Sequence, residues 1–78
     1  MQTPARYLVI IESGGASEAH MYTAERRRVA EFDPTEEVSV MTQGLVPQQG
    51  AEGSEWDPVL GGHSRAERAA ALVYTLDV

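Results

Sequence analysis

Residues Tyr7–Ile11 read Tyr-Leu-Val-Ile-Ile, and this short run constrains the fold more than any other part of the chain. Every position is apolar, and the β-branched valine and isoleucines favour extended backbone. A strand with apolar side chains in both alternating sets needs cover on both of its faces. The run therefore predicts a strand in the middle of a sheet.

The length of the chain and its lack of cysteine limit how that sheet can be stabilised. With 78 residues, the sequence predicts a single small domain over 1–78. A domain of this size buries only about 60% of its unfolded surface. Because cysteine is absent, neither a disulfide nor a thiolate–zinc site can supplement the core. Good packing or burial of a further face in a homodimer has to supply the stability.

Two further strands are expected after the central one. Gly14 and Gly15 lie in a turn over residues 13–18, because glycine adopts positive φ without penalty. A second strand is predicted over 19–25 and a third over 29–32. One helix over 17–32 is the alternative, but the spacing of its apolar residues is imperfect, and we favour the strands.

Two helices are predicted from their end signals. Asp33-Pro34 followed by two glutamates is a strong helix start, and Gly44 closes that helix as its left-handed C′ residue. Ser64 and Glu67 have the spacing of a capping box and open a second, alanine-rich helix that runs to Ala71.

Residues 73–78 alternate in a β-rich pattern and predict a final strand, although a helix to the end of the chain is the alternative. The predicted fold is α+β: a small antiparallel or mixed sheet of three to four strands with two short helices on one face.

The segment Gly44–His63 has neither a helical nor a strand period, and residues 46–62 are predicted as a long loop. Long loops in compact domains are usually functional or disordered, and a tryptophan argues against disorder. Residues 54–58 have the look of a single helical turn that carries Trp56. We expect Trp56 to cover the core, in a cluster with Leu45, Val46, Val59 and Leu60.

The alternative for this loop is a binding role, because tryptophan is enriched at interface hot spots. In that hypothesis Trp56 anchors a protein partner, and its neighbours in the loop form the walls of the site. The predicted partner-binding residues are Trp56, Val46, Pro47, Pro58 and His63.

The net charge of −6 works against attraction to nucleic acid or anionic membranes. The apolar runs are far shorter than the ~20 residues that span a bilayer. Lysine and asparagine are absent, which is typical of a GC-rich bacterial genome. We therefore expect a cytoplasmic bacterial protein without membrane contact. The Arg26–Arg28 triplet is interpreted as a solvated hairpin edge.

No motif predicts catalysis, a metal or a cofactor. Neither His20 nor His63 is assigned a helical i, i+4 carboxylate or histidine partner of the metalloprotease kind, and Ser64 is better explained as an N-cap than as a nucleophile. The glycine pairs lack a phosphate-binding fingerprint. A small hydrolase or metal-dependent enzyme that combines His63 with carboxylates such as Glu55 or Asp57 remains an alternative.

The chain resembles a group of short bacterial proteins of unknown role. The resemblance is carried by Gly62-His63-Ser64, Glu67-Arg68, the segment 29–33 and the final segment 73–78. The resemblance implies a bacterial protein and transfers no functional residue. The best-supported function is a small non-enzymatic protein-interaction module that uses the Gly44–His63 loop, with an unknown protein or itself as partner. Acidic regulation of a nucleic-acid-binding protein is a further alternative.

Overall fold

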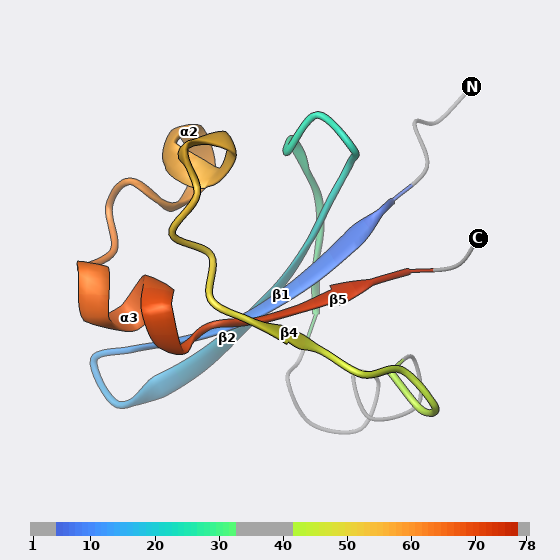
Figure 1. The fold of residues 1–78 in the computed structure, drawn as a ribbon, viewed down its shortest axis with the longest axis horizontal. Helices are drawn as coiled ribbons and strands as arrows, with labels where there is room; N and C mark the ends of the chain where they lie inside the picture. Colours follow the sequence, from blue (N-terminus) through green and yellow to red (C-terminus); the bar gives the residue numbers. More distant parts are fainter. Residues whose placement is uncertain (1–4, 33–41, 77–78) are drawn as a thin grey trace.

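The computed structural model describes residues 5–32 and 42–76, and they form an antiparallel sheet with strand order β3-β2-β1-β5-β4 (Figure 1). The strands are β1 (Tyr7–Ser13), β2 (Ala16–Tyr22), β3 (Arg28–Phe32), β4 (Gln48–Gln49) and β5 (Leu72–Thr75). The helical elements are the 3-10 turn η1 (Ser54–Trp56) and the helices α2 (Asp57–Leu60) and α3 (Arg65–Ala70). Figure 1 shows α2 and α3 at the same end of the sheet.

The prediction that residues 7–11 form a central strand is confirmed. β1 pairs with β2 along one edge and with β5 along the other. Val9 and Ile11 are buried on one face of the sheet, and Leu8 is fully buried on the other. Apolar side chains in both alternating sets of β1 therefore find cover.

The hairpin after β1 is confirmed, but its bounds differ from the prediction, because the turn is limited to Gly14 and Gly15 and β2 covers Ala16–Tyr22 instead of 19–25. Gly14 and Gly15 have φ values of 61° and 85° and form the turn between β1 and β2. The strand interpretation of residues 17–32 is confirmed, since β2 and β3 pair antiparallel with a register shift at Met21/Tyr22. The alternative of one helix over this range is wrong.

Residues 72–75 form β5, which confirms the predicted final strand for this stretch. The alternative of a continuing helix is wrong for the same residues. β5 pairs with β1 through Leu72–Thr75. Asp77 and Val78 lie outside the described residues.

The predicted strand count of three to four is too low, because the described residues alone form five strands. The additional strand is β4, in which Gln48 pairs with Val73 and Gln49 with Leu72. The backbone N–H of Gly50 extends this pairing with a 2.7 Å bond to the carbonyl of Ala71. Two glutamines give no apolar alternation, so this strand forms because β5 offers its outer edge.

Of the two predicted helices, the one from Ser64 is confirmed as α3. Its capping box is complete: Glu67 N–H donates to Ser64 Oγ at 3.1 Å, and Ser64 N–H donates to Glu67 Oε1 at 3.0 Å. The other helix is predicted to begin at Asp33, and residues 33–41 lie outside the described residues. The turn that follows does place Gly44 at φ 82°.

The core consists of one buried cluster on each face of the sheet. Trp56 is 4% exposed and packs with Leu60 against β1 and β2, so its interpretation as a cover for the core is confirmed. Val59 also packs against this cluster, as expected, but two members of the expected cluster need correction. Leu45 packs on the opposite face, and Val46 is 90% exposed. Within 5–32 and 42–76, no helix is long and apolar enough to cross a membrane.

Candidate functional site

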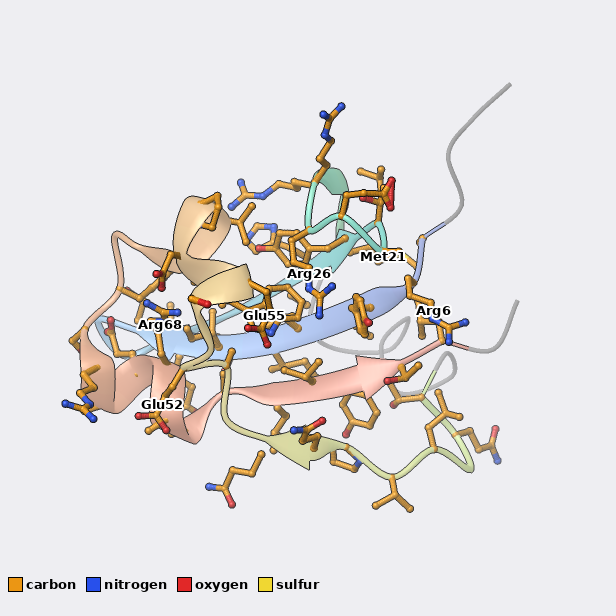
Figure 2. The ribbon with its side chains drawn as sticks, turned by 45° about the horizontal axis from the view of Figure 1, so that its top comes forward. Arg6, Met21, Arg26, Glu52, Glu55 and Arg68 are labelled. Atoms are coloured by element: carbon orange, nitrogen blue, oxygen red, sulfur yellow. The ribbon has the colours of Figure 1, made fainter. Side chains whose placement is uncertain are left out.

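Arg68 fixes the loop that carries Trp56. Its Nε donates to the carbonyl of Ala51 at 2.9 Å, and its Nη2 donates to the carbonyl of Gly53 at 3.1 Å and to Asp57 Oδ1 at 2.9 Å. The Arg68 side chain is only 13% exposed, and Figure 2 shows it between α3 and the segment that carries α2. The loop is therefore pinned to α3 by a planar side chain with several fixed donors.

The pinned loop places Trp56 between two tyrosines of the sheet. Both Tyr7 of β1 and Tyr22 of β2 lie 5.5 Å from Trp56, measured between ring centroids, in edge-to-face geometry. Aromatic pairs prefer this arrangement, because the positive edge of one ring meets the negative face of the other. The indole is thus held rigidly on the sheet.

Arg26 approaches the same rings from the turn between β2 and β3. The turn is closed by buried Thr23, whose N–H donates to the Arg27 carbonyl and whose carbonyl accepts from Arg26 N–H, each at 2.9 Å. Arg26 has a φ of 62°, a left-handed conformation that costs a non-glycine residue roughly 1–2 kcal/mol. This backbone geometry turns the Arg26 side chain back over β1.

The guanidinium of Arg26 then covers two rings. Its Cζ lies 4.6 Å from the ring centroid of Tyr7 and 5.0 Å from that of Trp56. Such cation–π contacts contribute about 0.5–2 kcal/mol, depending on desolvation. Nη1 donates to the Ala24 carbonyl at 2.6 Å, while Nε is buried without a hydrogen-bond partner.

A groove of about 400 Å³ opens beside this stack, and we call it the Arg26 groove. It is lined by Tyr7, Arg26, Gln48, Gly50, Gly53, Glu55, Trp56, Val73 and Thr75. Arg26 and Glu55 lie on the same side of the sheet but come from different elements (Figure 2). Among the residues that the structure describes, neither charge has an ion-pair partner. The groove therefore offers one guanidinium and one carboxylate to a ligand.

This placement of Arg26 corrects the interpretation of the arginine triplet. Arg27 is exposed, as a solvated hairpin edge requires, but Arg26 is half-buried against aromatic rings. The difference arises from the positive φ of Arg26, which no pattern in the sequence signals.

Only one of the five predicted partner-binding residues lines the groove, and it is Trp56. Val46 and Pro58 are exposed, while Pro47 and His63 are half-buried. Sequence reasoning missed the residues that complete the groove from outside the loop, above all Tyr7 and Arg26.

The histidines belong to separate surroundings. His63 Nδ1 lies 3.5 Å from Glu67 Oε1, so His63 does have a carboxylate at i+4, contrary to the sequence analysis. The pKa of Glu67 is lowered, chiefly by the hydrogen bond from the Ser64 backbone and further by the charge of His63. His20 instead lies 3.8 Å from Glu18. In the described ranges, no three His, Cys, Asp or Glu side chains gather as metal ligands.

Comparison with protein-family models, curated proteins and solved structures finds no match to this chain. The chemistry of the site follows from the geometry of the Arg26 groove.

Proposed function

We propose that this chain is a small, non-enzymatic, cytoplasmic protein-interaction module whose Arg26 groove receives a segment of a partner protein. One observation carries the proposal. The guanidinium of Arg26 is held over the rings of Tyr7 and Trp56 at the wall of an open groove, without an ion-pair partner in the described part of the chain.

The energetics of Arg26 favour a ligand. A partly buried charge without a counter-charge is costly, and a buried N–H without an acceptor adds to that cost. The left-handed backbone at Arg26 adds further strain, and strained residues are concentrated at binding and catalytic sites. A counter-charge supplied by a partner at the Nη donors would offset the cost of the unpaired charge at the moment of binding.

The groove also has the dimensions and lining of a binding site. Its volume of about 400 Å³ lies in the range of roughly 300–1,000 Å³ that is usual for ligand pockets. Tyr7, Trp56 and Val73 contribute to its walls, but Trp56 and Val73 are almost fully buried, so the exposed lining is mostly polar and suits a polar or charged group of the partner. Because Arg68 and the aromatic stack hold the walls in place, little entropy is lost on binding.

The lining residues support binding rather than catalysis. Nucleophilic catalysis needs a nucleophile beside a base, and among the described residues no hydrogen bond joins Thr75 or Tyr7 of the groove to Glu55. His63 does not line the groove, and its contact with Glu67 belongs to the start of α3.

Selection from a displayed peptide library tests this function. We expect peptides that are enriched on the wild-type chain to lose binding to Thr75→Trp, because Thr75 is exposed in the groove and a large uncharged side chain would fill it. Val46→Ser is the matched control, since Val46 is exposed but does not line the groove.

Two results would contradict the proposal. Peptides that bind Thr75→Trp normally but fail on Val46→Ser would move the site to the loop around Val46. A library without enriched peptides, combined with monomeric sedimentation, would argue against an interaction module altogether.

A further inference from the structure

We infer that the group recognised in the Arg26 groove is a single carboxylate, supplied by an Asp or Glu side chain or by the C-terminus of the partner segment. This inference rests on the proposed function and adds the chemical class of the ligand. It starts from the donors of Arg26 that the fold leaves unused.

A guanidinium carries five N–H donors in one plane. In Arg26, one donor on Nη1 bonds the Ala24 carbonyl, and Nε is buried. The rings of Tyr7 and Trp56 lie against the guanidinium, with Cζ over each ring. The remaining donors are on the two Nη atoms, at the end of the side chain that lines the groove.

A carboxylate matches these donors. Its two oxygens accept two parallel N–H bonds from a guanidinium, and such charge-assisted bonds are about twice as strong as neutral ones. The aromatic walls keep water from part of the pair, which strengthens the attraction. Gln48, exposed on the groove wall, adds an amide donor that can reach an acidic group.

Arg26 is the cation among the residues that line the groove, so a ligand with one negative charge neutralises it, whereas a more highly charged ligand leaves excess negative charge beside Glu55. Glu55 lines the same groove, and the whole chain has a net charge of −6. A phosphate group, which carries about −1.5 to −2 at neutral pH, would meet more repulsion than a carboxylate of charge −1. Nucleic acid, with its row of phosphates, is disfavoured even more strongly.

The test uses NMR titration of the ¹⁵N-labelled chain with matched glycine-rich peptides. One pair differs only in a central Asp or Asn, with both ends blocked. The second pair differs only in a free or amidated C-terminus. We expect shift changes at the Trp56 indole N–H and the Arg26 Nε–H with at least one acidic peptide, at a Kd at least tenfold lower than that of its amide partner. The pair that responds identifies the source of the carboxylate.

Inorganic phosphate at the same concentration should produce smaller shifts than the acidic peptide. Equal affinity for the acid and amide peptides would overturn the carboxylate assignment, and so would tighter binding of phosphate. Either result would leave the proposed interaction function standing. The library selection would still test that function, and it would then enrich peptides without carboxylates.

Arg26→Lys separates recognition from structure. Lysine keeps a cation near the rings but lacks the fork of donors, so we expect at least a fivefold loss of affinity for the acidic peptide with an unchanged thermal unfolding midpoint. Arg65→Ala is the control, because Arg65 is 93% exposed and does not line the groove. Full affinity in Arg26→Lys would overturn bidentate recognition.

Discussion

Arg26 lies with its guanidinium over the indole of Trp56, at 5.0 Å from Cζ to the ring centroid. The two residues come from distant segments, one from the turn after β2 and one from the loop before α2. Neither segment forms the Arg26 groove alone. The site is therefore a product of the tertiary fold.

The first prediction concerns Arg68, which pins the loop. Arg68→Ala removes the donors for the carbonyls of Ala51 and Gly53 and the partner of Asp57. We expect the free energy of unfolding to fall by about 2–4 kcal/mol, because Ala51 is buried and its carbonyl loses its charged donor. Urea denaturation at neutral pH measures the change.

Arg65→Ala provides the matched control for Arg68. Arg65 lies on the same helix, is 93% exposed and contacts Glu52 only at 3.6 Å. Exposed pairs of this kind contribute little, so we expect a change within about 0.5 kcal/mol. Equal effects of the two substitutions would show that Arg68 does not hold the loop.

Much of the fold could be predicted from local sequence, and the reasons are physical. Residues 7–11 are apolar in both alternating sets, and this pattern requires the central position that β1 has. Ser64 and Glu67 form a capping box whose bonds join residues only three apart. In both cases the structural signal lies within one short segment.

The site could not be predicted, because its determinants join separate segments. β4 has no apolar pattern and depends on the edge of β5. Arg68 has the sequence setting of an ordinary exposed helix residue, but its acceptors lie in the preceding loop. Arg26 adopts a positive φ that is uncommon in residues other than glycine.

The second prediction tests the part of the loop that belongs to the core. Leu60 is 1% exposed and packs in the cluster of Trp56. Leu60→Ala should lower the free energy of unfolding by about 2–5 kcal/mol, since it removes buried methyl groups and leaves a cavity. Thermal unfolding followed by circular dichroism measures this loss.

Val46→Ala is the comparison for Leu60→Ala. Val46 is 90% exposed, so its truncation should change stability by less than about 0.5 kcal/mol. If the two truncations destabilise the chain equally, the division of the loop into a core part and a solvent part is wrong.

The third prediction concerns pH and the capping box. The pKa of Glu67 is lowered from 4.5, chiefly by the Ser64 backbone N–H and further by His63. A lowered folded-state pKa gives stability that is complete above the unfolded-state value and is lost as the pH falls through the folded-state value. The stability difference between wild type and Glu67→Gln should therefore be fully present at about pH 5.5 and shrink as the pH falls below about 4.5.

Urea denaturation of both chains at several pH values between 3 and 7 measures this difference. A gap that stays constant down to pH 3 would contradict the role of the ionised Glu67 carboxylate in the cap.

The fourth prediction compares two exposed glycines. Gly15 has a φ of 85°, whereas the φ of Gly62 is not in the left-handed region, and an added Cβ meets no atom within 4 Å at either position. Gly15→Ala should destabilise the chain by about 1 kcal/mol or more, because alanine is strained at positive φ. Gly62→Ala should be neutral or slightly stabilising in the same denaturation assay, and the reverse order would contradict the turn geometry.

The central claim is that Arg26 provides the binding energy of the groove. The most direct test is the Kd of the best peptide from the library selection, measured by calorimetry. The wild type is compared with Arg26→Ala, and Arg65→Ala is the control. We predict at least a tenfold weaker Kd for Arg26→Ala and a change of less than twofold for Arg65→Ala, with both variants folded. An unchanged Kd in folded Arg26→Ala would contradict the account.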